Sequence, residues 1–224
     1  LSCMGIPARA DLLWDNNLEV DGIRGRAVSP PAFPNIRVVD DIVVPAQEEW
    51  HITGFNYQLL EDNDWVHGGW TEVFVWGDIG RQPGGPRLFS QVVEHTRVAT
   101  GNMYFGRFAY KFYASGLRIN LEPGRYWIGL RNPQASGSGT AYWMSSDGGR
   151  DGAGTEAGWL STDGGQNWIP IGSGTQFAFE VHGTVVPEPV SLVSLGGLLA
   201  ALTLRQRGRR SRTGGTPGVL REIR

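Results

Sequence analysis

The chain has 224 residues, of which 40% are hydrophobic and 19% are charged, which is enough for one sizeable core but too little for two large domains. Its 33 glycines, 13 prolines and aromatic share of 11% stand against a single lysine, Lys111, and this composition favours β structure over helix. Residues 11–185 hold 20 acidic against 12 basic side chains, so this acidic body argues against nucleic acid as a partner.

Residues 1–10 are expected to be the remnant of a signal peptide. Ala8 and Ala10 place small side chains at the two positions that signal peptidase inspects, which predicts cleavage after Ala10 and export. Cys3, the single cysteine, would leave with this segment, so the mature protein would hold no disulfide. Two alternatives are a frayed N-terminus of a cytosolic domain and lipidation at the Ser2-Cys3 pair.

The body, residues 11–183, is predicted to be a single all-β domain. Short runs with a period of two recur between clusters of Gly, Pro, Asn and Asp, a pattern typical of a two-sheet antiparallel β-sandwich, and we expect it to be jelly-roll-like. Residues 55–59 and 117–121 alternate apolar and polar side chains, so each strand should bury one face and expose the other. Residues 71–76 and 125–130 are more continuously apolar and suit central strands, and residues 177–181 close the domain.

Acidic pairs raise the question of catalysis or ion binding. Asp40-Asp41, Glu48-Glu49 and the run from Glu61 to Asp64 could supply an acid and a base for glycoside hydrolysis. Neighbouring side chains on a strand point to opposite faces, so we interpret Asp40-Asp41 as a turn or loop anchor. The run from Glu61 to Asp64 offers oxygen ligands for a weak Ca²⁺ site, although a solvated acidic turn is the interpretation we favour. The four histidines are scattered and predict no zinc site: His51, His67, His95 and His182.

Three of the nine tryptophans lie close together in the sequence. Aromatic faces stack on the apolar C–H surfaces of sugar rings, and a β-sandwich is a common platform for such contacts. Carbohydrate stacking is therefore a hypothesis for Trp65, Trp70 and Trp76, against the alternative that they belong to the core.

Residues 161–168 fit the pattern Ser-x-Asp-x-Gly-x-x-Trp and resemble the Asp-box of sialidases and other propeller glycosidases. The positions that carry the pattern are Ser161, Asp163, Gly165 and Trp168. Its chemistry is that of a hairpin turn, in which the carboxylate accepts backbone N–H groups, glycine supplies a positive φ and the tryptophan packs underneath. One such domain cannot hold a multi-blade propeller, so we expect the turn to be structural.

The C-terminal segment contains three successive features. Val186, Pro187, Glu188 and Pro189 are expected to form an extended hinge over 184–189. Residues 190–204 are uncharged and apolar, and we expect them to form one short transmembrane helix. Residues 205–224 form a basic tail whose arginines mark the cytoplasmic side of the membrane: Arg205, Arg207, Arg209, Arg210 and Arg212.

This order of motif, apolar segment and arginine cluster resembles the PEP-CTERM sorting signal, also catalogued as the ice-binding protein C-terminal domain. The resemblance implies recognition of Pro187, Glu188 and Pro189 by an exosortase, a membrane enzyme that cuts near this element and delivers its substrates to the cell surface or extracellular polymer matrix. Residues 213–224 extend beyond the usual end of such signals. A permanent C-terminal membrane anchor is the alternative.

The body resembles the β-sandwich that often precedes this signal in secreted bacterial proteins, through residues 39–45, 52–57, 121–128 and 176–183. We therefore expect a surface or matrix-associated structural or interaction protein, with no catalytic residues, no metal and no cofactor. A non-catalytic carbohydrate-binding domain is the second hypothesis, and extracellular polysaccharide is a candidate partner. A glycoside hydrolase of sialidase type is the third.

Overall fold

The computed structural model describes residues 10–18, 25–28, 34–146, 158–172 and 175–187. The chain divides into a unit of residues 1–186 and a second unit of residues 187–224, of which only Pro187 is described. The segment 190–204, predicted to be a transmembrane helix, and the basic tail 205–224 lie outside the described residues, as do residues 1–9. Among the described residues, no helix has the length and hydropathy needed to span a bilayer.

The first unit is all-β, as predicted, and its main sheet is large and antiparallel. The strands are β1 (Asp11–Asp15), β2 (Gly25–Ala27), β3 (Arg37–Val44), β4 (Glu48–Glu61), β5 (Trp65–Val66), β6 (Trp70–Asp78), β7 (Pro83–Tyr104), β8 (Arg107–Leu121), β9 (Gly124–Arg131), β10 (Ser136–Gly137), β11 (Ala141–Ser146), β12 (Trp159–Ser161), β13 (Ile169–Pro170), β14 (Gln176–Phe177) and β15 (Phe179–Pro187).

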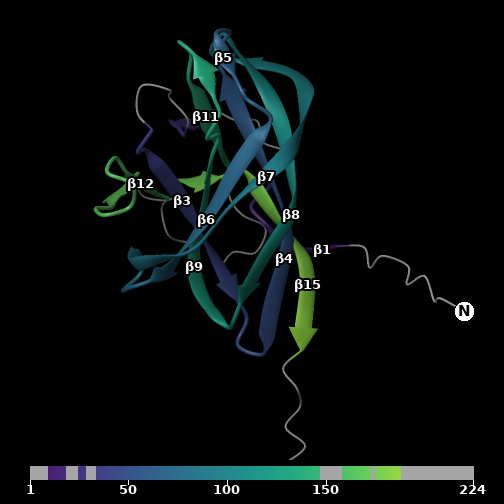
Figure 1. Cartoon of the computed structure of the whole chain (residues 1–224), viewed down its shortest axis with the longest axis vertical. Helices are drawn as coiled ribbons and strands as arrows, with labels where there is room; N and C mark the ends of the chain where they lie inside the picture. The colour runs from purple at the N-terminus through teal and green to yellow at the C-terminus, as the bar shows by residue number, and fades with distance from the viewer. Residues whose placement is uncertain (1–9, 19–24, 29–33, 147–157, 173–174, 188–224) are drawn as a thin grey trace, which may run out of the picture. The chain divides into compact units, whose positions relative to one another are not determined.

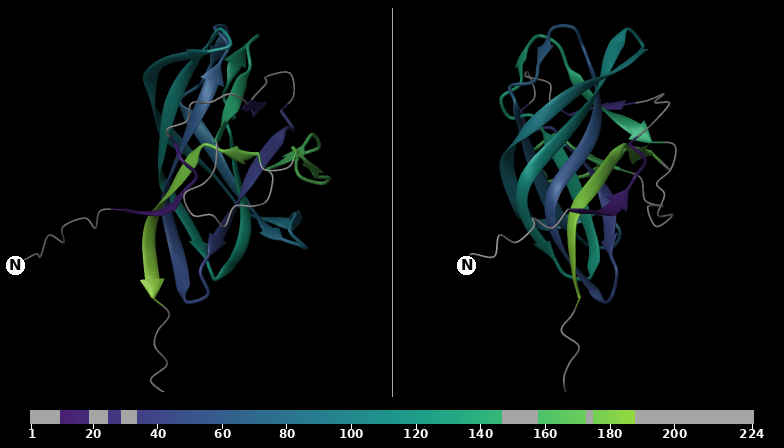
Figure 2. Two further views of the ribbon diagram at one scale, coloured as in Figure 1. Left: turned by 180° about the vertical axis from the view of Figure 1, so that it is seen from behind. Right: turned by 90° about the vertical axis from the view of Figure 1, so that its right-hand side faces the viewer.

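The hydrogen-bonded strand order is β1-β15-β4-β8-β7-β6-β9-β3-β12-β13, with β11 joining β4, β2 and β14 (Figure 1). The two sheets expected from the sequence are therefore connected into one. The connection is β7, since its residues 83–94 pair with β6 and its residues 95–104 pair with β8. Figure 2 shows this long strand curving from one half of the sheet to the other.

The main core lies between the two halves of the sheet. It joins residues of β4 and β8, such as Tyr57 and Phe112, whose rings stack 4.9 Å apart, to residues of β6 and β9, such as Val75 and Ile128. The apolar positions predicted for residues 55–59, 117–121, 71–76 and 125–130 are buried here or on the sheet's covered outer face, except Tyr126, which is partly buried against the core. Their burial removes the apolar side chains from water, which is the main stabilising contribution to such a fold.

Two smaller apolar clusters cover outer faces of the sheet. Phe74, Trp76 and Trp127 on one half pack beneath Trp159 and Trp168 of the segment that carries β12 and β13. Leu60, Ala109, Met144 and Ala178 form the other cluster. For this reason Gln58, predicted to be wet, is only 2% exposed.

The C-terminal strand corrects the predicted domain boundary. β15 continues to Pro187, so the extended hinge expected from residue 184 begins inside a strand. Proline lacks an N–H donor but is tolerated at the edge or end of a strand, where no ladder hydrogen bond is lost. Val186 is 42% exposed at the end of this strand.

Candidate functional site

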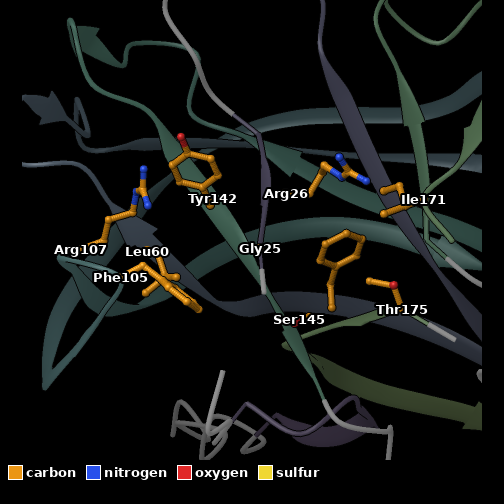
Figure 3. A pocket seen from close by; sticks show the side chains of 10 residues that line it. Gly25, Arg26, Leu60, Phe105, Arg107, Tyr142, Ser145, Ile171 and Thr175 are labelled. Atoms are coloured by element: carbon orange, nitrogen blue, oxygen red, sulfur yellow. The ribbon is translucent and has the colours of Figure 1, made fainter. Parts of the chain in front are cut away.

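A cavity of about 400 Å³ opens where β2, β11 and the β7–β8 turn come together (Figure 3). Its volume is within the usual range for small-molecule sites. Apolar, aromatic, hydroxyl and cationic side chains line it, and no carboxylate is among its described lining residues: Gly25, Arg26, Leu60, Phe105, Arg107, Tyr142, Ser145, Ile171, Thr175 and Phe177.

One end of the cavity is formed by an arginine held between a carboxylate and an aromatic ring. The Nε atom of Arg107 donates to Oδ1 of Asp62 at 2.6 Å, and its guanidinium carbon lies 4.6 Å from the centre of the Tyr142 ring. Asp62 also accepts from the N–H of Thr140 at 2.9 Å, so its position is fixed from two sides. A guanidinium has five N–H donors, and the contact through Nε leaves others for a ligand.

The other end of the cavity is formed by Arg26 on the short strand β2 (Figure 3). β2 lies tightly against β11, because a Cβ atom on Gly25 would lie 3.0 Å from Cβ of Tyr142 and 3.1 Å from the carbonyl oxygen of Trp143. Arg26 is exposed, and within the described residues it makes no ion pair. In Figure 3 the two arginines lie on opposite sides of Gly25.

Phe105 lies in the two-residue turn between β7 and β8. Its φ is 52° and that of Gly106 is 76°, and positive φ at both central positions is typical of a type I′ turn. Such turns favour Asn-Gly, because a bulky side chain is strained in the left-handed region. Phe105 is nevertheless 69% exposed at the cavity, so packing in the core does not explain its presence.

The Asp-box-like turn has the geometry of a self-contained hydrogen-bonded loop. Oδ1 of Asp163 accepts from the Ser161 hydroxyl at 2.7 Å and from the backbone N–H groups of Gln166 and Asn167, both at 3.0 Å. These donors, the Asn167 N–H first among them, hold the pKa of Asp163 well below its usual value. Gly165 has a φ of 99°.

Trp168 anchors this turn to the sheet. Its ring meets the ring of Trp76 edge to face, with 5.0 Å between the centroids. A polar groove of about 410 Å³ separates the turn from the β6–β7 hairpin around residues 79–85. The turn therefore acts in the structure as a cover on the outer face of β6, and no described acidic side chain lines the groove beside it.

The three tryptophans considered for carbohydrate stacking do not form an exposed row. Trp65 and Trp76 are 5% and 2% exposed, so the stacking hypothesis is wrong for these two side chains. Trp65 belongs to the main core, and Trp76 is covered by Trp168. Trp70, at the start of β6, is half-buried. Sequence periodicity could not reveal the burial of Trp76, because the segment that covers it, residues 158–172, lies far from β6 in the sequence.

The acidic pair Asp40-Asp41 lies in β3, not in a turn or loop, and both carboxylates are buried. The side chains do point to different partners: Asp40 accepts from the Phe177 N–H at 2.6 Å, and Asp41 pairs with Arg125. Burial holds the pKa of Asp40 well above its usual value, while the Phe177 N–H opposes this shift. Both aspartates therefore have structural roles.

The run from Glu61 to Asp64 is not a solvated acidic turn throughout, because its first two members are bound by arginines. Glu61 ends β4 and receives two hydrogen bonds from Arg97, at 3.1 and 2.5 Å, and Asp62 binds Arg107. With these oxygens engaged, the arrangement does not favour the Ca²⁺ site. Within the part of the chain that the structure describes, no group of three or more candidate metal ligands occurs.

The sequence predicted four scattered histidines, but two of them, His67 and His95, lie in contact. Nδ1 of His67 lies 3.1 Å from Nε2 of His95, and Nδ1 of His95 lies 2.8 Å from the Thr71 hydroxyl. On β15, His182 contacts Glu180 at 2.9 Å, and the hydrogen bond from His182 is the main cause of a lowered pKa at Glu180. His51 is exposed on β4.

Of the predicted sorting residues, Val186 and Pro187 lie at the end of β15, whereas Glu188, Pro189 and the five arginines from Arg205 to Arg212 lie outside the described residues. No family model matches the chain, and comparison with curated proteins and with solved structures gave no match. The likeness to the sorting signal therefore rests on residues 186–212 alone.

Proposed function

We propose that this chain is an exported bacterial protein of the cell surface or extracellular matrix, with a structural or interaction role. The observation that carries this proposal is the order of features after the folded unit: Val186 to Pro189, the uncharged apolar run 190–204 and the arginines from Arg205 to Arg212. An exosortase would recognise Pro187, Glu188 and Pro189 and process the chain nearby. The chain would be anchored in the membrane only until that step.

The position of the motif relative to the fold supports this proposal. β15 is the last strand described and ends at Pro187, so the first two residues of the motif, Val186 and Pro187, end this strand, and Glu188 and Pro189 come directly after it in the sequence. At the other end, β1 starts at Asp11, the residue after the proposed signal-peptide cleavage site. Cleavage after Ala10 and beyond Pro187 would leave the described sheet intact.

The finer architecture belongs to the same proposal. We infer a two-layer, jelly-roll-like β-sandwich in which β7 crosses between the layers, followed by a single transmembrane helix over 190–204 and a cytoplasmic basic tail. The proposed role involves no catalysis and no cofactor. The buried carboxylates of Asp40, Asp41, Glu61 and Glu72 are bound by N–H donors or arginines, which supports structural roles for them. The acidic body makes nucleic acid a poor partner.

Carbohydrate binding is the second candidate function, and the cavity beside Phe105 favours it. An exposed aromatic ring in a strained turn, beside Tyr142 and two arginines, is a better basis for sugar binding than the tryptophans considered from the sequence. Glycoside hydrolysis has no comparable support, since no carboxylate is among the described residues that line this cavity.

The test of the sorting proposal is to express the full chain in hosts with and without an exosortase, then to fractionate the cells and measure intact masses. With the enzyme, the surface form should lose the segment beyond the motif; without it, the full tail should stay in the membrane. Glu188→Gln should slow the processing, and Glu222→Gln, the same change outside the motif, should leave it unchanged. A full tail that persists in the membrane of both hosts would show a permanent anchor and overturn the proposal.

A further inference from the structure

We propose that the cavity between β2, β11 and the β7–β8 turn binds an acidic saccharide, namely an oligomer of uronic acids whose carboxylates are held by Arg26 and Arg107. This inference rests on the second candidate function, carbohydrate binding, and is independent of the sorting proposal. The tryptophans considered for sugar stacking from the sequence, Trp65, Trp70 and Trp76, are not among the residues that line this cavity.

The charge of the cavity points to an anion. Residues 11–185 carry an excess of eight acidic side chains, 20 against 12. The described lining of the cavity nevertheless holds two arginines and no carboxylate. Asp62 binds Arg107 through Nε, and Arg26 makes no ion pair within the described residues. A local cationic cavity in an acidic unit selects for negatively charged groups.

The positions of the two arginines favour a ligand with more than one charge. Figure 3 shows Arg107 beside Tyr142 on one side of Gly25 and Arg26 near Ile171 on the other. A planar guanidinium fork matches the geometry of a carboxylate. A uronic acid oligomer carries a carboxylate on each ring, so one chain could reach both arginines.

The aromatic side chains explain why the ligand should be a sugar and not a simple polyanion. Phe105 presents an exposed ring, and Tyr142 presents a ring against which Arg107 is already stacked. Sugar rings offer apolar C–H faces to such surfaces, and Thr175 adds a hydroxyl for their polar edges.

A role in folding does not explain why residue 105 is a phenylalanine. A phenylalanine at φ 52° costs conformational energy that asparagine would avoid in the same turn. The residue is 69% exposed, so burial of its ring does not offset this conformational cost. Replacement of Phe105 by asparagine should therefore leave the fold as stable as before or more stable, and should remove a contact with the ligand.

The experiment is calorimetric titration of the purified full chain with a tetramer of galacturonic acid. The reference ligands are a neutral glucose tetramer and a sulfated glycan of similar length. We expect the uronate tetramer to bind and the two reference ligands not to bind. Arg26→Gln should weaken binding of the uronate about tenfold or more, because it removes a charge-assisted hydrogen bond. Arg118→Gln, which removes an exposed arginine of β8 away from the cavity, should leave the affinity unchanged.

Phe105→Asn separates binding from folding. Its midpoint of urea unfolding should be equal to or above that of the parent chain, while its affinity for the uronate tetramer falls about tenfold. The proposal is overturned if the uronate does not bind, if the neutral or sulfated glycan binds equally well, or if Arg26→Gln or Phe105→Asn keeps the parent affinity. Processing by an exosortase is read from a different assay, so failure of one proposal leaves the other standing.

Discussion

Nδ1 of His67 lies 3.1 Å from Nε2 of His95, at the outer end of a hydrogen-bonded row that continues through Thr71 to the buried hydroxyl of Tyr57. Nδ1 of His67 also accepts the Gly69 N–H at 3.2 Å, so this nitrogen carries no proton and Nε2 of His95 donates to it. Burial lowers the pKa of both histidines and so favours the neutral rings. A neutral His95 that donates from Nε2 accepts the Thr71 hydroxyl at Nδ1.

The first prediction is a loss of stability in acid that depends on His95. Burial, with the charges of His67 and Arg97, lowers the pKa of His95 from 6.5 to about 4. Between these values the unfolded chain binds more protons than the folded one, so the free energy of unfolding should fall as the pH drops from about 6.5 towards about 4. Urea unfolding at several pH values measures this dependence.

His95→Gln should flatten this pH dependence, since it removes the group whose pKa differs between the two states. The exposed His51 provides the matched control, and His51→Gln should keep the slope of the parent chain. Equal slopes for His95→Gln and the parent chain would contradict the assignment of the acid sensitivity to this pair.

The second prediction concerns Asp40 as an acceptor of backbone and amide hydrogen bonds. Oδ2 accepts from the Phe177 N–H at 2.6 Å and from Asn16 Nδ2 at 3.3 Å, while Oδ1 accepts from the Asp41 N–H at 3.0 Å. Asn in this position would turn an N–H₂ group towards one of these donors. Asp40→Asn should therefore lower the free energy of unfolding by about 1–3 kcal/mol, the cost of leaving a buried donor unpaired.

Urea denaturation compares this variant with Glu94→Gln, which makes the same chemical change at an exposed position of β7. The control should change the free energy of unfolding by less than about 0.5 kcal/mol. An Asp40→Asn variant as stable as the control would mean that the carboxylate is protonated in the fold and that its oxygens are not all acceptors.

Periodicity predicted the strands that bury a face, and it missed the strand that connects the sheet. Residues 117–121 show their alternation locally, because every second side chain enters the core. In β7, by contrast, only Pro83 and Val93 are buried, so no apolar pattern marks its 22 residues. Backbone pairing with β6 and β8 holds this strand, and such pairing leaves little trace in the side chains.

The cavity could not be predicted for a related reason. Arg26, Phe105, Arg107 and Tyr142 come from separate strands and turns, and their meeting depends on the order β2-β11-β4-β8. The one local signal was Phe105-Gly106, a bulky residue where a hairpin turn favours asparagine. His67 and His95 likewise meet only once the register of β6 against β7 is known.

The third prediction tests how closely β9 packs between β3 and β6. A Cβ atom at Gly129 would lie 2.1 Å from the carbonyl oxygen of Val38 and 2.5 Å from Cε2 of Phe74. The oxygen belongs to the backbone of a paired strand and cannot move without disturbing the sheet. Gly129→Ala should thus destabilise the protein by about 3 kcal/mol or prevent folding.

Gly77→Ala is the matched variant, because a Cβ there would meet Cδ1 of Leu88 at an ordinary 3.6 Å. Its midpoint of thermal unfolding should stay close to that of the parent chain. If both variants melt at the parent temperature, β9 has room for a side chain at residue 129 and the close approach to Val38 is wrong.

The last prediction concerns the turn that covers β6. Hydrogen bonds from the Asn167 N–H, the Ser161 hydroxyl and the Asn167 amide keep the pKa of Asp163 below its usual value. A carboxylate with a lowered pKa in the folded state stabilises the fold above its unfolded pKa and loses that contribution as the pH falls through the folded value. Asp163→Ala should remove this contribution at neutral pH, whereas Asp64→Ala, at an exposed position outside the turn, should not.

The measurement is fluorescence of the Trp168–Trp76 pair, whose rings lie 5.0 Å apart. Loosening of the turn should expose both rings to water, so Asp163→Ala should shift the emission to longer wavelength well below the temperature at which the sheet unfolds. Trp168→Phe removes one of the two rings and should reduce that shift, which assigns the signal to this pair. If the emission of Asp163→Ala changes only at the global unfolding temperature, the turn is held by the packing of Trp168 on β6 and not by the Asp163 carboxylate.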